Sequence, residues 1–174
     1  SFTADVFPHD DFIAKCCIQW EESADLFKEK TRVVKFRTGI VLDKDRGAIP
    51  KMASSIKIGM GAPLGKGDQF MPWIHIDDIA NLYIYALEKE INGTFNAVCG
   101  EHVTNKEFTK ELARSLNKKI WLKKVPSFLI KTIYGEMANI VLCGSKVSNE
   151  KILSVGFEYK YTTLRNALNN INSK

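Results

Sequence analysis

The 174-residue sequence has no long uninterrupted apolar run. Its longest apolar stretch, residues 125–142, contains Lys131, Glu136 and Asn139, so it falls short of the uncharged span that a transmembrane helix needs. Residues 1–11 hold several acidic side chains and no apolar core, which is unlike a targeting peptide. We therefore expect a cytoplasmic protein that does not insert into membranes.

Cysteine is scarce, and neither sign of charge dominates. The four cysteines, Cys16, Cys17, Cys99 and Cys143, fit no metal-ligand spacing, which predicts a reduced protein without a metal site. The 25 Lys and Arg against 20 Asp and Glu give a formal charge of +5. This excess favours anionic partners but does not distinguish nucleotide phosphates from nucleic acid. With 45% hydrophobic and 26% charged residues, the composition excludes a disordered chain.

Helical and extended patterns alternate along the chain, which is typical of an α/β fold. In residues 11–30, apolar side chains recur every three or four positions and predict an amphipathic helix with Glu21, Glu22 and Lys28 on its solvated face. Its apolar positions are Phe12, Ile13, Cys16, Cys17, Trp20, Ala24 and Phe27.

The runs 32–42 and 94–98 are too apolar for surface strands and predict strands buried in a parallel sheet. Between them the sequence predicts, in order, a short helix near Pro50 with Ile49, Met52, Ala53 and Ile56 on one side, a loop at 59–67, an extended segment at 70–76, and a helix capped by Asp77 or Asp78.

The last third of the chain is rich in helical patterns. Thr104 and Glu107 have capping-box spacing and predict a helix to about Leu116. After it the sequence predicts a short strand at 120–124, a helix from Pro126, and two small helices capped by Ser148 and by Thr162 or Thr163.

Two familiar motifs are weak. The glycines of residues 59–67 do not keep G-x-G-x-x-G spacing, and an extended segment follows them instead of the helix whose N–H groups would bind a pyrophosphate. Tyr85 and Lys89 form a Y-x-x-x-K pattern, but on a helix face that we expect to be solvated, so a chance match is favoured.

Two other features stay open. His75 stands where a strand ends and a helix begins, so a ligand role and a hydrogen bond to Asp77 or Asp78 are equally good interpretations. Trp121 lies among Lys118, Lys119, Lys123 and Lys124, a pattern that can bind single-stranded nucleic acid. The favoured interpretation is a plain strand, with Ile120 and Leu122 inward and the lysines in water.

Three segments together carry a family resemblance: FRTGIVL at 36–42, GMGAPLGKGDQFMPWIHIDDIA at 59–80 and GTFNAVCGEHVTNKEF at 93–108. They resemble the C-terminal part of atypical extended short-chain dehydrogenase/reductases, the nucleoside-diphosphate-sugar epimerase-like group. The resemblance covers nearly the whole chain, including VPSFLIK at 125–131 and VGF at 155–157.

The resemblance implies the C-terminal half of a Rossmann-type parallel sheet at 1–117 and a small helix-rich domain at 118–174. It implies NAD or NADP as cofactor and a nucleotide-sugar-like substrate. In that family the glycine-rich cofactor loop and the catalytic serine and tyrosine precede the segment that matches Ser1. We therefore assign no catalytic residue and expect no activity from these residues alone.

By the same resemblance, Arg37, Thr38, Gly39 and Ile40 match the stretch beside the nicotinamide. Gly39 would allow close approach of the cofactor, although a glycine relieving crowding in a buried strand is nearly as good an interpretation.

Gln69, Trp73 and His75 match the segment that reaches the substrate, where an indole can stack on a base. Plain core is the alternative for Trp73. Lys51 is a candidate for a phosphate contact, although a plain surface lysine is favoured.

One departure concerns the first helix, where Lys15 is the only candidate for the family's catalytic lysine and does not follow a tyrosine by four. A non-catalytic sensor of dinucleotides or sugar nucleotides is therefore the first alternative function, and a basic nucleic-acid module is the second. The helix at 11–30 is also a candidate homodimer surface.

Overall fold

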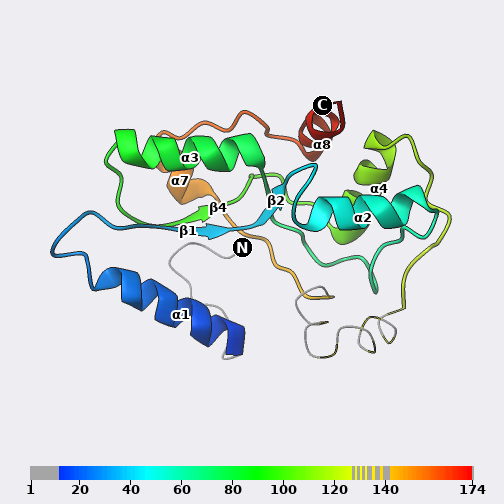
Figure 1. Cartoon of the computed structure of the whole chain (residues 1–174), viewed down its shortest axis with the longest axis horizontal. Helices are drawn as coiled ribbons and strands as arrows, with labels where there is room; N and C mark the ends of the chain where they lie inside the picture. Colours follow the sequence, from blue (N-terminus) through cyan, green and yellow to red (C-terminus); the bar gives the residue numbers. More distant parts are fainter. Residues whose placement is uncertain are drawn as a thin grey trace.

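A computed structural model describes residues 12–126 and 142–173, together with 128, 130, 132, 135 and 138. Its elements alternate in the predicted α/β manner (Figure 1). The helices are α1 (Phe12–Asp25), α2 (Ala48–Lys57), α3 (Ile76–Glu88), α4 (Asn105–Ser115), α7 (Glu150–Ser154) and α8 (Leu164–Ser173). The strands are β1 (Val34–Thr38), β2 (Ile40–Leu42), β3 (Trp73–His75) and β4 (Gly93–Ala97). Within the described ranges, no helix has the length and apolar character needed to cross a bilayer.

The strands form two parallel pairs. β1 pairs with β4, with Val34 opposite Gly93, and β2 pairs with β3, with Ile40 opposite Trp73. The predicted parallel pairing is confirmed. The prediction of a single strand over 32–42 is wrong, because this segment divides at Gly39 into β1 and β2. The N–H of Gly39 donates to the carbonyl of Ala97 at 3.2 Å, whereas the next N–H donates to Pro72 on the other side at 2.8 Å.

The first turn of α3 differs from the prediction. Its cap is His75, whose Nδ1 accepts a hydrogen bond from the N–H of Asp77 at 3.0 Å. Asp78 is buried and binds the backbone N–H groups of Lys160 and Tyr161 instead. The predicted acidic cap is therefore wrong, because one carboxylate is used for a tertiary contact.

The other helices follow the local sequence signals more closely. α2 buries Ile49, Ala53 and Ile56, as predicted, and the capping box at the start of α4 is formed. The N-cap of α7 is Asn149 rather than the predicted Ser148, although Ser148 Oγ, one residue earlier, accepts from the N–H of Glu150. At the start of α8, however, the N–H of Leu164 donates to the Glu101 carboxylate.

The segment 120–124 is not a strand, so that prediction is wrong. Ile120 packs against the core, but Trp121 and Leu122 are both exposed. The helix expected from Pro126 lies largely outside the described residues.

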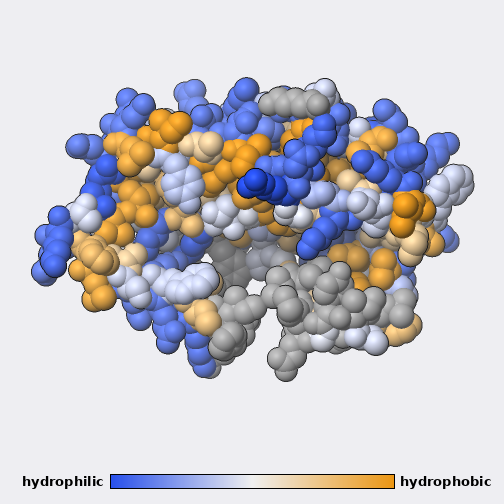
Figure 2. All heavy atoms as spheres, viewed as in Figure 1, coloured by the Kyte–Doolittle hydropathy of each residue, from blue (hydrophilic) through white to orange (hydrophobic). Residues whose placement is uncertain are grey.

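The expected division of the first helix into an apolar inward face and a solvated face is wrong. Trp20 and Phe27, expected to pack inward, are 76% and 56% exposed. Glu21, expected in water, is held against β1 by Lys35 and Arg37. Figure 2 shows apolar residues reaching the molecular surface on the side of α1 and β1.

Two apolar clusters form the core. The larger joins Leu42 and Trp73 to Phe108 of α4 and Leu168 of α8. The smaller joins strand residues such as Phe95 to side chains of α3 and α7, including Leu82 and Ile152. The C-terminal helices α7 and α8 thus pack against the strands and the helices that precede them.

Candidate functional site

The two strand pairs diverge at Gly39, which follows the carboxyl end of β1. A Cβ on Gly39 would lie 2.7 Å from the carbonyl oxygen of Pro72 and 2.9 Å from Cγ1 of Val98. Only glycine fits between these neighbours. In α/β proteins, ligands bind beside the carboxyl ends of strands, where neighbouring strands part, so this is where a ligand site is expected.

A groove of about 560 Å³ lies beside this point, between α1 and β1. Most of its lining is apolar. Helix residues on one wall include Cys17 and Trp20, and strand residues on the other include Phe36, Arg37 and Thr38. The groove therefore brings together two of the predicted cofactor residues, Arg37 and Thr38.

The charges beside the groove are paired. Arg37 donates to both Glu21 carboxylate oxygens, from Nε at 2.6 Å and from Nη2 at 3.0 Å. Lys35 adds an ion pair with Asp25 at 2.7 Å and one with Glu21 at 3.6 Å. The hydrogen bond from Arg37 is the main cause that holds the pKa of Glu21 below its ordinary value, against the opposing effect of burial. These groups fasten α1 to β1.

The groove suits a flat apolar group better than a phosphate. Its apolar walls suit a flat ring, and Thr38 is exposed, with a hydroxyl able to hydrogen bond to a carboxamide. Arg37 is engaged by Glu21, so its guanidinium is not presented to a phosphate.

The other predicted residues lie elsewhere. Ile40 pairs with Trp73 in the second sheet, and Trp73 has no exposed surface. His75 is 1% exposed and stacks on Tyr161 with ring centroids 3.8 Å apart. In this structure both rings are core, and their contact with substrate stays a prediction.

Gln69 and Lys51 are not part of the groove lining. Gln69 is buried, and its side-chain amide donates to the carbonyl of Leu64 at 3.2 Å. Lys51 is exposed on α2. Their substrate roles likewise stay predictions.

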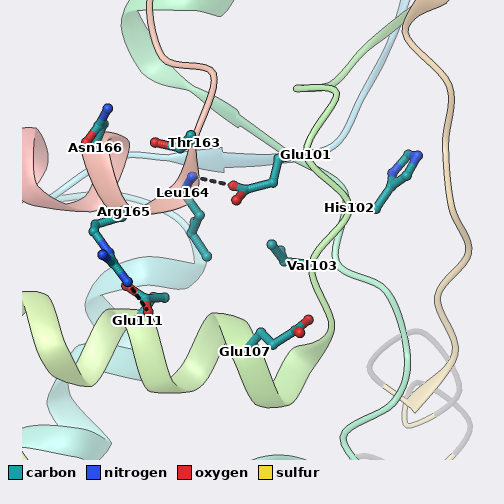
Figure 3. Close-up of a pocket in the computed structure, with 9 residues that line it drawn as sticks. All are labelled: Glu101, His102, Val103, Glu107, Glu111, Thr163, Leu164, Arg165 and Asn166. Atoms are coloured by element: carbon teal, nitrogen blue, oxygen red, sulfur yellow. Dashed lines mark hydrogen bonds and ion pairs between the residues drawn. The ribbon is translucent and has the colours of Figure 1, made fainter.

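A second hollow, of about 540 Å³, lies between α4 and α8 (Figure 3). Its carboxylates already have structural partners. Glu101 binds the N–H of Leu164, Glu107 belongs to the capping box, and Glu111 pairs with Arg165 at 3.1 Å. In the described part of the chain, no cluster of His, Cys, Asp or Glu is arranged to hold a metal ion.

A third hollow, of about 580 Å³, adjoins Cys99 and Tyr159 beyond the end of β4. Burial raises the pKa of the Cys99 thiol to about 11, and it also raises the pKa of Tyr159. Both groups stay protonated at neutral pH, so neither is poised as a nucleophile or general base.

The Tyr85 and Lys89 pair is not catalytic in this arrangement. Tyr85 was expected in water, but its hydroxyl donates to the carbonyl of Val155 at 2.6 Å and its ring packs on Phe157. Lys89 is the exposed C-cap of α3.

Sequence reasoning did not assign Cys17, Trp20 and Glu21 to a site. Cys17 and Trp20 read as the inward stripe of an amphipathic helix, and Glu21 read as its solvated face. The available signal was the basic pair Lys35 and Arg37, which occupies alternate positions of a strand and so needs acidic partners on one face.

Two family models match the chain. Residues 40–98 match the NAD dependent epimerase/dehydratase family, and residues 125–171 match a domain of unknown function, DUF1731. The epimerase match begins at Ile40, directly after the point at which the strand pairs diverge.

Curated relatives agree with these matches. The epimerase family protein SDR39U1 of Mus musculus is 38% identical over 163 residues, 92% of this chain and 55% of the mouse protein. A chloroplastic SDR39U1 homolog of Arabidopsis thaliana is 37% identical over 159 residues, covering 91% of this chain and 46% of that protein. The chain spans about half the length of the curated relatives it matches.

Solved structures show the same fold. Human epimerase family protein SDR39U1 (isoform2) with NADPH superposes with a TM-score of 0.92 at 33% identity, over 99% of this chain and 59% of the human one. UDP-N-acetylglucosamine 4-epimerase from Bacillus cereus superposes with a TM-score of 0.76 at 17% identity, over 99% of this chain and 57% of that one. The fold is that of Rossmann-like epimerases.

Proposed function

Because this chain belongs to the NAD-dependent epimerase/dehydratase family, we propose that it forms the substrate-side portion of an NAD(P)-dependent nucleoside-diphosphate-sugar epimerase or related oxidoreductase. The observation that carries the proposal is the apolar groove beside the carboxyl end of β1, at the point where the strand pairs diverge.

Within this proposal, Thr38 hydrogen bonds to the nicotinamide carboxamide, and Cys17 with Trp20 walls the ring. The backbone of Gly39 and Ile40 lies behind the nicotinamide ring. A bound nicotinamide supplies hydride transfer; the chain's own residues orient the ring and exclude water from it. The human relative, which was solved with NADPH, supports the choice of cofactor.

Solved structures of the same fold support the substrate class. UDP-glucose 4-epimerase from Thermotoga maritima was solved with UDP-glucose. We assign Lys51, Gln69, Trp73 and His75 to the substrate side of this chain. The division into domains at 117 and 118, a homodimer through residues 11–30 and a cytoplasmic location belong to the same proposal.

Titration with reduced nicotinamide mononucleotide, followed by amide chemical shifts, tests the groove. We expect shifts confined to α1 and β1 and a several-fold weaker affinity in Thr38→Val, because one hydrogen bond is lost. Thr31→Val, an exposed threonine before β1, is the matched control and should bind as the unaltered chain does. Shifts centred elsewhere, or none, would refute the assignment of this groove.

A non-catalytic sensor is the alternative that the engaged Arg37 and the lack of a Y-x-x-x-K pair in α1 favour. Nicotinamide absorbance, followed over a panel of UDP- and dTDP-sugars with a full-length relative that contains this chain's segments, separates the two. Turnover excludes the sensor. Because an epimerase returns the hydride that it removes, tight binding excludes the enzyme only where neither the nicotinamide absorbance nor the sugar itself changes. Binding of single-stranded DNA that weakens steeply with salt would instead support the nucleic-acid module.

A further inference from the structure

A surface outside the candidate site combines exposed apolar side chains with lysines. Trp121 and Leu122 are 77% and 47% exposed. Four exposed lysines flank them: Lys118, Lys119, Lys123 and Lys124. We call residues 118–124 the basic–aromatic loop. Because no strand forms here, Leu122, which the favoured sequence interpretation turned inward, is exposed together with Trp121.

The loop is fastened at both ends. Ile120 packs against the larger core cluster. Val125 donates its N–H to the carbonyl of Pro63 at 2.8 Å and accepts from the N–H of Gly65 at 2.9 Å. Trp121 is therefore exposed on a segment that is fixed at both ends, not on a free chain end.

A neighbouring loop extends the apolar surface. Leu64 and Val125 form a parallel bridge, so the residues before each approach it from the same direction. Those before Leu64 include Ile58 and Met60, which are 71% and 64% exposed. The segments after α2 and after α4 run together at this end of the molecule (Figure 1). Apolar and hydrophilic residues are intermixed there in Figure 2.

The charge of the loop is not balanced within the described part of the protein. The ion pairs of the described residues lie on α1 and β1, around Asp77, within α4, and between α4 and α8. None of those ion pairs uses the four lysines of the loop. A partner that suits this surface presents negative charge and accepts apolar side chains.

We propose that the basic–aromatic loop docks on an anionic lipid membrane surface. An indole is stable at the membrane–water interface, aliphatic side chains enter the acyl boundary, and lysines attract acidic headgroups. Single-stranded nucleic acid is favoured less, because it binds through successive stacking aromatics. This surface has one exposed indole beside Leu122, Ile58 and Met60, whose aliphatic chains do not stack on bases.

Vesicle flotation tests the proposal. The purified chain is mixed with vesicles of phosphatidylcholine alone, or of equal parts phosphatidylcholine and phosphatidylserine. We expect binding to the acidic vesicles only, weakened by salt. Lys123→Glu with Lys124→Glu should lower the partition coefficient at least about tenfold, since each lysine near an acidic surface adds to the attraction for its headgroups. Trp121→Ser should lower it several-fold.

Matched variants separate this surface from general charge and hydrophobicity. Lys44→Glu with Lys89→Glu makes the same change of charge at exposed lysines elsewhere, and Leu87→Ser removes a 74% exposed apolar side chain from α3. Both should bind vesicles as the unaltered chain does. Circular dichroism checks that every variant is folded.

The proposal is overturned if the chain binds neither vesicle. It is also overturned if the loop variants bind as well as the controls, or if a single-stranded oligonucleotide binds through these residues while acidic vesicles do not. None of these results bears on the groove between α1 and β1, so the two proposals fail separately.

Discussion

The carboxylate of Asp78 accepts hydrogen bonds from the backbone N–H groups of Lys160 at 2.8 Å and Tyr161 at 3.1 Å. Asp78 is 1% exposed and lies in the first turn of α3. One buried side chain therefore fixes the C-terminal segment, 82 positions away, against the end of β3. Since Tyr161 also stacks on His75, the same contact closes the core over the strand.

We predict that Asp78→Asn lowers the free energy of unfolding by about 2 kcal/mol. The amide keeps one acceptor but turns its NH₂ group toward a backbone N–H, and charged hydrogen bonds are the stronger ones. Urea denaturation measures the change. Asp77→Asn is the control, with a half-buried side chain and only longer contacts, and should cost less than about 1 kcal/mol. Equal losses would show that Asp78 has no special role.

Gly39→Ala should destabilise the fold by about 1–3 kcal/mol, because the new methyl group overlaps the carbonyl of Pro72 and the side chain of Val98. Thermal unfolding measures it. Gly59→Asn is a suitable comparison: Gly59 has φ +79°, a conformation that asparagine tolerates, and open space around its Cβ position. If Gly39→Ala is as stable as the unaltered chain, the two strand pairs can move apart to make room for the methyl group without loss of stability.

Arg37→Met should loosen α1. The substitution removes both hydrogen bonds to Glu21, whose carboxylate is only 16% exposed, and should cost about 1–2 kcal/mol. Hydrogen exchange of α1 amides should accelerate while α4 amides keep their rate. Lys28→Met breaks a more exposed ion pair with Asp25 and should change exchange little. Unchanged α1 exchange in Arg37→Met would show that other contacts hold the helix.

The attachment of α1 should weaken in acid. Folding lowers the pKa of Glu21 below its ordinary 4.5, chiefly through the hydrogen bond from Arg37. A lowered folded pKa stabilises the folded state above about pH 4.5, and that contribution is lost as the pH falls toward the folded pKa. Amide exchange in α1 between pH 7 and pH 3, referenced to α4, should show this loss. Glu21→Gln should lack this part of the pH dependence, although Asp25 and Lys35 share the cluster. An identical profile in both proteins would contradict the assignment.

The sequence by itself determined the elements whose causes are local. Thr104 and Glu107 fix the start of α4 through bonds three residues apart, and Ile49, Ala53 and Ile56 fix the buried face of α2 by their spacing. The apolar runs likewise marked parallel strands, although β1 is only half-buried, and the family resemblance supplied the Rossmann-like fold. Propensity, capping and periodicity act within a few residues, so they can be read from the chain.

Only the tertiary structure decided which partner each group meets. Gly39 divides a strand because successive N–H groups find acceptors on opposite sides, and Asp78 leaves the helix cap because backbone 82 residues away needs its carboxylate. Trp20 is exposed and Glu21 is held because α1 meets β1 through charge, not through its apolar stripe. Such choices compare the free energies of contacts between distant segments, and local patterns carry no information about which distant segment will be there.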